Sequence, residues 1–281
     1  MDNLSFTPKG IRREAQGLLA DNWTRALATL CLSLFALAAF LVFNRLVTAL
    51  IGVAEGGSDA QTEVTQLNSL LDYYEYYSSR GFRFTYIINL ILTAFYFMLS
   101  APLNMGIVKW YQSVAQCGDL KVGQVFHYYR DNQRFTDALS FEVNRLVRHV
   151  IVGGLCAAPS LVCFSRALSA AVDGKSGAGS VALLGGVLLL VGLLVYAFIM
   201  LRWFVARYLF TAGIRQSVAR CFSTSAEFMR GHVFKVLRVY ISLLPLILSC
   251  LLVAPIVYAV PVINASLAAC AQDIIDSRTA A

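Results

Sequence analysis

Two arginines within otherwise uncharged stretches are the residues best placed to do chemistry. Arg45 interrupts the apolar segment 25–53 and Arg166 interrupts the apolar segment 149–171, each in its outer part. Guanidinium groups bind phosphates and carboxylates through two parallel hydrogen bonds, so the pair predicts an anion or lipid-headgroup site. In the competing interpretation each side chain extends separately to the outer headgroups and the two share no ligand.

Three asparagines could line a polar cavity. Asn89 and Asn104 lie in the second apolar stretch, and Asn264 lies just after the last one. Pro102 and Pro255 predict kinks in the same two segments. Broken helices expose backbone polar groups in transporters, so this set predicts the central cavity of a small carrier.

No other set of polar residues has the spacing of a catalytic or metal site. His127, His149 and His232 fall at predicted interface positions, without a nucleophile or carboxylate at a recognisable spacing. The seven cysteines form neither a Cys-x-x-Cys pair nor a Cys/His cluster with zinc-like spacing. The sequence therefore predicts no catalytic residue, no metal and no cofactor.

The elements that hold these residues are long apolar helices. Hydrophobic residues make up 58% of the 281-residue chain and charged residues only 14%, well below the roughly 25% of soluble domains. A helix of about 20 apolar residues crosses a bilayer. Five such spans are expected, at about 25–53, 85–113, 149–171, 181–208 and 236–262. The fold class predicted is an all-α, polytopic transmembrane helical bundle, with 1–281 as a single integral membrane domain.

Between the spans, the polar segments are too short for a soluble domain. Interfacial amphipathic helices are expected at about 8–22, 120–146 and 214–230, and an outer loop at about 55–83. The last apolar stretch is predicted as one kinked span. A six-span fold with a tight hairpin at Pro255–Pro261 is the alternative.

Acidic and basic residues are distributed differently along these elements. No Asp or Glu falls inside a predicted span, which disfavours a proton-coupled or cation-coupled carrier. Of the 23 basic residues, 17 lie in segments that would face the cytoplasm if the N-terminus does. This bias predicts a cytoplasmic N-terminus and, with five spans, a C-terminus on the opposite side. The net charge of +7 is scattered, so nucleic acid is not expected as a partner.

Small residues recur on the third and fourth spans. Gly153 and Gly154 are each followed by an alanine four residues later, and Gly185, Gly186 and Gly192 lie on the next span. Such stripes allow helices to approach closely. They predict either packing within the chain or contact with a second copy or another membrane protein.

Three short segments resemble a bacterial integral membrane family catalogued as domain of unknown function 975. They are Ile11–Trp23 (IRREAQGLLADNW), Ala101–Phe126 (APLNMGIVKWYQSVAQCGDLKVGQVF) and Ser225–Val233 (SAEFMRGHV). They are similar to its basic opening helix, its Pro-Leu-x-x-Gly segment and its approach to the last helix. The last helix departs from the family, because Pro255 and Pro261 precede Ile256 and Val262 where Pro-Tyr is common. The resemblance implies a bacterial inner-membrane protein and assigns no catalytic or ligand residue.

Together these observations predict a non-enzymatic, multi-pass protein of the bacterial cell membrane. Its expected role is that of a structural or accessory component of the envelope, in contact with membrane lipids and with a membrane-protein partner or a second copy. The alternative is a small transporter or lipid-handling protein built around the kinked second and fifth helices.

Overall fold

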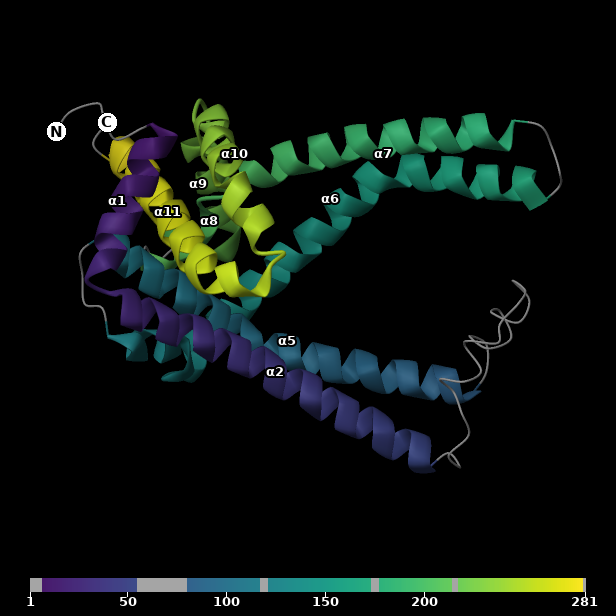
Figure 1. The fold of residues 1–281 in the computed structure, drawn as a ribbon, viewed down its shortest axis with the longest axis horizontal. Helices are drawn as coiled ribbons and strands as arrows, with labels where there is room; N and C mark the ends of the chain where they lie inside the picture. Colours follow the sequence, from purple (N-terminus) through teal and green to yellow (C-terminus); the bar gives the residue numbers. More distant parts are fainter. Residues whose placement is uncertain (1–6, 55–79, 117–120, 173–176, 214–216, 280–281) are drawn as a thin grey trace.

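The computed structural model describes residues 7–54, 80–116, 121–172, 177–213 and 217–279, and these residues form helices joined by turns. The α-helices are α1 (Pro8–Ala20), α2 (Trp23–Ala54), α5 (Arg80–Ala115), α6 (Asn132–Val172), α7 (Ala178–Leu201), α8 (Ala206–Thr211), α9 (Val218–Phe228), α10 (Val233–Ser249) and α11 (Val253–Thr279). A 3₁₀ helix, η1 (Val122–Tyr129), precedes α6. Two long hairpins extend from a common base: α2 with α5, and α6 with α7 (Figure 1). The fold is all-α and polytopic, as predicted.

Five helices are each long and apolar enough to cross a membrane, and the bent pair formed by α9 and α10 makes a sixth if it is one span. The five cover Trp23–Ile51, Tyr86–Ala115, Asn132–Val172, Ala178–Thr211 and Pro255–Thr279. The outer parts of the two hairpins expose many large apolar side chains, such as Leu50 (69% exposed) and Leu194 (70%). Exposed apolar surface on this scale belongs in lipid.

The N-terminal helix packs against protein. Thr7 caps α1 by accepting a hydrogen bond from the Gly10 amide at 3.2 Å, and Pro8 occupies the first turn. Ile11, Ala15 and Leu19, the predicted apolar face, are at most 2% exposed because they pack on α11. The helix predicted at 8–22 is therefore confirmed, but its apolar face is buried in the base instead of lying on the headgroups.

Residues 120–172 differ from the prediction. The expected interfacial helix 120–146 is divided into η1 and the first turns of α6, and α6 continues without a break to Val172. Its 41 residues extend about 60 Å, twice the thickness of the hydrocarbon layer. The sequence changes from amphipathic to apolar near His149, but no Gly or Pro lies there to end the helix. The predicted boundary between two helices rested on this change of polarity, which does not interrupt the backbone of α6.

The segment predicted as one kinked span, 236–262, is broken into two helices, so that prediction is wrong. α10 ends at Ser249, a turn at 250–252 follows, and α11 begins at Val253 and packs back on α10. Pro255 lacks an amide hydrogen and fits the first turn of a helix, which favours a new start over continuation. A hairpin is present, as in the alternative, but its turn lies at 250–252, and the segment Pro255–Pro261 that was expected to turn lies inside α11.

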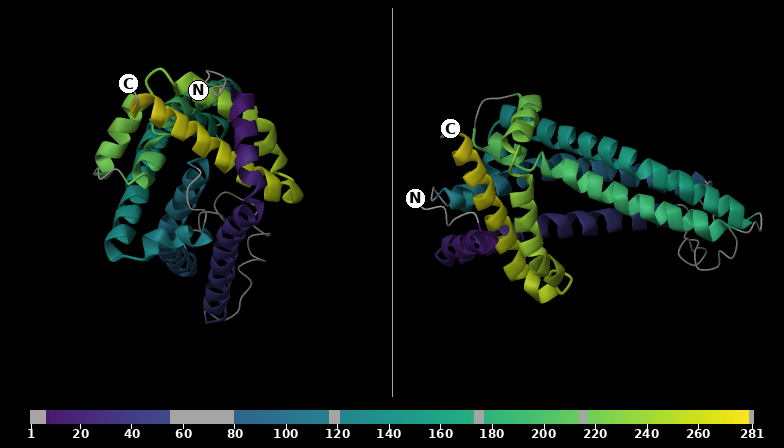
Figure 2. Two further views of the ribbon diagram at one scale, coloured as in Figure 1. Left: turned by 90° about the vertical axis from the view of Figure 1, so that its left-hand side faces the viewer. Right: turned by 90° about the horizontal axis from the view of Figure 1, so that it is seen from above.

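Within this hairpin, α11 is the central helix of the base. Half of the residues in the most apolar 18-residue stretch of α11 are buried, whereas only 6% of those in the corresponding stretches of α6 and α7 are. Small residues make this possible: Ala259, Ala265, Ala268 and Ala271 are at most 2% exposed. The hairpin runs at a steep angle to the two arms (Figure 2, right).

The ends of the chain lie near each other at the base, where α1 packs along α11 (Figure 1). The turn at 250–252 brings α11 back to α1, whereas the predicted single span would have carried the end of the chain away from it. Two further boundaries move. α5 begins at Arg80, inside the predicted outer loop 55–83, of which 55–79 lies outside the described residues. The third interfacial helix, predicted at 214–230, is α9, Val218–Phe228.

Longer helices also bring acidic residues into the candidate spans. Asp137 and Glu142 lie in α6, and Asp273 and Asp276 lie in α11. The expectation that spans carry no carboxylate held only for the predicted boundaries. Glu142, 2% exposed, becomes central to the site described next.

Candidate functional site

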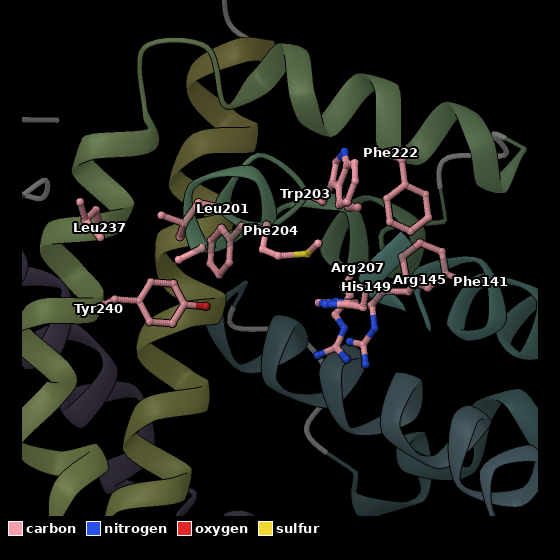
Figure 3. A pocket seen from close by; sticks show the side chains of 13 residues that line it. Phe141, Arg145, His149, Leu201, Trp203, Phe204, Arg207, Phe222, Leu237 and Tyr240 are labelled. Carbon is pink, nitrogen blue, oxygen red and sulfur yellow. The ribbon is translucent and has the colours of Figure 1, made fainter. Parts of the chain in front are cut away.

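A pocket of about 440 Å³ lies where α6, α7 and α10 meet at the base. Its lining is Phe141, Arg145 and His149 of α6; Ala197, Met200 and Leu201 of α7; Trp203 and Phe204 of the following turn; Ala206 and Arg207 of α8; Phe222 of α9; and Leu237 and Tyr240 of α10. The nitrogen atoms of Arg145, His149 and Arg207 gather at one place in this pocket (Figure 3). Most of the remaining wall is apolar.

The polar end is built on one face of α6. Glu142, Arg145 and His149 are spaced i, i+3, i+7, so their side chains lie one above another along the helix. Glu142 Oε2 lies 3.0 Å from Nη2 of Arg145. Since α6 is unbroken here, the three groups keep a fixed spacing.

Arg207 reaches the same carboxylate from α8. Its Nη2 lies 3.5 Å from Oε1 of Glu142. The Glu142 side chain is 3% exposed, whereas those of Arg145 and Arg207 are 29% and 33% exposed. One buried carboxylate therefore holds two guanidinium groups that remain partly accessible, and the trio carries a net charge of +1.

The turn after α7 directs Arg207 inward. Successive short-range bonds, such as Trp203 N to Met200 O at 3.0 Å and Phe204 N to Leu201 O at 3.1 Å, re-aim the chain from α7 into α8. Gln112 of α5 is buried and fixes α8 in place. Its amide donates to the Tyr208 carbonyl at 3.2 Å, and its oxygen accepts from the Thr211 hydroxyl.

His149 links the two helices of the upper hairpin. Its Nδ1 lies 2.7 Å from the Tyr196 hydroxyl of α7. When Nδ1 accepts a hydrogen bond from that hydroxyl, Nε2 carries the ring hydrogen and is a donor. The imidazole then adds a third donor beside the two guanidinium groups.

Arg148 holds the aromatic wall in position. Its guanidinium lies 4.5 Å from the ring centroid of Phe222 and 5.1 Å from that of Trp203, and its Nε donates to Asn144 Oδ1 at 2.9 Å. Cation–π contacts of this kind stabilise the ring orientation. Phe141 stacks on Phe222 with centroids 5.1 Å apart.

Donors at the polar end outnumber acceptors. Among the residues that the structure describes, Nε of Arg145, Nε of Arg207 and one acceptor, Oε1 of Glu142, are buried without a hydrogen-bond partner. Buried donors without acceptors are costly, and an oxyanion would satisfy them. The arrangement is that of an anion site with an apolar extension.

The predicted arginine pair does not form a shared site. Arg45 is exposed on α2 in the lower hairpin, and Arg166 is exposed on α6 in the upper hairpin (Figure 1). The two hairpins diverge, so the two residues lie on separate arms. Separate extension to the headgroups fits this placement.

The three asparagines are also dispersed. Asn89 and Asn104 both lie on α5, 15 residues or about 22 Å apart along the helix. Asn104 is exposed, and Asn264 of α11 hydrogen-bonds the buried Tyr111. None of the three contributes to the pocket described above.

The small residues of α6 and α7 divide into two groups. A Cβ on Gly192 would lie 2.4 Å from the Cys156 carbonyl oxygen, and one on Gly185 would lie 3.2 Å from Cβ of Cys163, so both serve packing within the hairpin. Gly154 and Gly186 face open space.

Sequence reasoning missed the site, although a signal was present. The Glu142, Arg145, His149 spacing is visible in the sequence. It was overlooked because residues 120–146 and 149–171 were assigned to different elements. Arg207 lies 58 residues beyond His149 in the sequence, so no spacing pattern connects it with these three residues. Its partnership with Glu142 depends on the turn at 202–205.

Comparison with protein-family models, with curated proteins and with solved structures finds no match for this chain. The resemblance to the family of unknown function therefore stays a prediction. Any function must be argued from the geometry of the pocket.

Proposed function

We propose that this protein is a non-enzymatic membrane component that binds an anionic lipid in the α6–α7–α10 pocket. The observation that carries the proposal is the pairing of two accessible, net-positive arginines with an adjoining apolar wall. Arg145 and Arg207 would hold the phosphate, and Met200, Leu201 and Leu237 would contact the first part of an acyl chain.

The same reasoning favours lipid over a fully soluble anion. Most residues that line the pocket are aliphatic or aromatic, and α6 and α7 carry exposed apolar side chains along their length. A soluble anion would leave this wall in water. An amphiphile covers the arginines and the apolar surface together.

The wider setting follows from the sequence. A cytoplasmic N-terminus is supported by the excess of basic residues on that side. Arg278, at the end of α11, belongs on the same side as these basic residues, because its Nη2 donates to the carbonyl of Arg230 at 2.7 Å. We place the protein in the inner membrane of a bacterium, as an accessory or lipid-handling component of the envelope, in contact with a membrane-protein partner or a second copy.

Competitive lipid binding tests the proposal. The full-length protein would be reconstituted in nanodiscs of equal parts phosphatidylglycerol and phosphatidylcholine, released into detergent, and weighed with its bound lipids by native mass spectrometry. We expect one retained phosphatidylglycerol. Ala197→Phe fills the apolar part of the pocket and leaves both arginines intact, so it should reduce the retention of phosphatidylglycerol.

The matched control is Ala171→Phe, the same change at an exposed position near the far end of α6. It should retain phosphatidylglycerol as the wild type does. Equal retention of both lipids by the wild type, or equal loss in both variants, would contradict the proposal.

A further inference from the structure

A second cavity lies between η1 and the end of α5 that carries Lys109. It has a volume of about 450 Å³ and is lined by Lys109, Lys121, Gly123, Gln124, His127 and Arg130. Among the described residues, its lining has three basic side chains and one imidazole, and neither a carboxylate nor a large apolar side chain. Its character is therefore opposite to that of the pocket between α6, α7 and α10.

A close helix approach builds this cavity. A Cβ on Gly106 would lie 1.8 Å from the Val125 carbonyl oxygen, so only glycine allows η1 to lie directly on α5. Val125 is 0% exposed as a result. One turn of α5 beyond Gly106, Lys109 lies with its Nζ 5.9 Å from the Tyr128 ring centroid. The lysine is thereby held beside His127.

The pKa of the His127 imidazole reflects the positive charge around this cavity. The pKa of His127 is lowered to about 4 by partial burial and by the neighbouring Lys109, Arg134 and Arg130. Nη1 of Arg134 lies 3.4 Å from Nε2 of His127, so Nε2 is the acceptor and Nδ1 carries the hydrogen. At neutral pH the ring is an uncharged donor among cations.

Of the described acidic groups near this cavity, two lie on the adjoining side. Asp131 and Asp137 line a neighbouring cavity that shares Lys109 and His127. Asp131 Oδ2 lies 4.0 Å from Nε of Arg134, at the limit of an ion pair, and both side chains are about half exposed. Arg130 and Lys109 on the η1 side face no carboxylate in the lining of their cavity.

One further polar group lacks a partner. Oε1 of Gln124 is buried without a hydrogen-bond partner among the described residues. The oxygen and nitrogen of a side-chain amide exchange places on a half turn, so this group can also donate. Donors of three kinds thus face one small, hydrophilic space.

We propose that the η1 cavity binds a phosphate group, held by Lys109, Arg130 and the His127 ring. Fixed cations and neutral donors around a water-accessible space suit a tetrahedral oxyanion with two negative charges. The absence of an apolar wall in this lining separates the site from the lipid pocket. A hydrophilic phosphate monoester, inorganic phosphate or a headgroup phosphate presents the same chemistry, and the experiment separates them.

The test uses the full-length protein in nanodiscs of phosphatidylcholine. Inorganic phosphate would be titrated calorimetrically at pH 7 and constant ionic strength, with chloride as the balancing anion. Saturable binding is expected. Arg130→Gln should weaken it about 10-fold, as the loss of one charged hydrogen bond implies. Arg220→Gln, an exposed arginine on α9, is the matched control and should bind like the wild type.

Imidazole NMR gives an independent readout. Bound phosphate adds negative charge beside His127, so the ring should titrate at a higher pH in its presence, and the signal is assigned from its loss in His127→Gln. If phosphatidic acid in the nanodisc abolishes phosphate binding, the source is a headgroup; if it has no effect, the ligand is soluble. Absence of saturable binding in both arms, or equal weakening in Arg220→Gln, would overturn the proposal. Ala197→Phe should leave this site intact, which separates its failure from failure of the lipid pocket.

Discussion

Nη2 of Arg207 lies 3.5 Å from Oε1 of Glu142, although α8 and α6 are separated along the chain by the whole of α7. The carboxylate is almost completely buried and pairs with Arg145 on its other oxygen. A buried carboxylate with two partners costs solvation energy, which the two arginines offset. Its position under the pocket makes it the group that orients both guanidinium forks.

Glu142→Gln should therefore have two opposite effects. Without the carboxylate, two arginines lose their partner, and the free energy of unfolding should fall by about 1–3 kcal/mol. The pocket, however, gains a net positive charge, so retention of phosphatidylglycerol should increase. Thermal unfolding in detergent and native mass spectrometry measure the two effects. A fall in both would argue that Glu142 shapes the pocket and that charge does not drive binding.

Arg145→Gln should lower retention of phosphatidylglycerol about 10-fold, since one charged hydrogen bond to the phosphate is lost. Combined with Glu142→Gln, it should be less destabilising than the sum of the two single changes, because the pair is removed together. A double-mutant cycle on the unfolding free energy tests this. Exact additivity would mean that the 3.0 Å pair contributes nothing to stability.

Gly106→Ala should disturb the base specifically. The new methyl group would collide with the Val125 carbonyl, so η1 must move away from α5, at a cost of about 1–3 kcal/mol or more. Gly154→Ala is the control, since its Cβ meets nothing within 4 Å. Melting temperatures of the two variants should differ by several degrees. Equal melting would show that η1 does not pack as described.

Acid should destabilise the protein through His127. Its pKa in the folded state is about 4, below the ordinary value near 6.5, so between these pH values the unfolded chain binds a proton that the folded chain does not. The free energy of unfolding should therefore fall as the pH drops from about 6.5 toward 4 and level off below. His127→Gln should flatten this part of the profile, measured by chemical unfolding at several pH values. An unchanged slope would contradict the assignment.

Both ends of the chain should face the same side of the membrane. Single cysteines at Thr7 and at Thr279, placed in a background without the native cysteines, should react with an impermeant maleimide from the same side of inverted vesicles. The reason is the turn at 250–252, which returns α11 to α1. Labelling of the two positions from opposite sides would restore the single kinked span.

The sequence predicted what depends on local pattern. Apolar length predicted the long helices, and the Thr7–Pro8 pair predicted the start of α1. It could not predict that Ile11 and Ala15 pack on α11, because an apolar face looks the same whether lipid or protein covers it. The turn at 250–252 contains only Cys and Leu, and the nearby Pro255 is as compatible with a kink as with a new helix start, so the sequence does not decide between them.

The candidate site was less predictable than the fold. Its charges come from α6 and α8, and its apolar wall from α7 and α10. Arg45 and Arg166 attracted attention because charges in apolar segments are unusual, yet each lies exposed on a separate arm. Arg145 lies inside α6 and Arg207 in the first turn of α8, and only the tertiary fold brings the two to one carboxylate.

An experimental structure of the protein in nanodiscs containing phosphatidylglycerol tests the central claim most directly. The account predicts a headgroup phosphate within hydrogen-bond distance of Arg145 and Arg207, with its acyl chain along Met200 and Leu237. Ordered lipid phosphates at Arg45 or Arg166, beside an empty pocket between α6, α7 and α10, would contradict it.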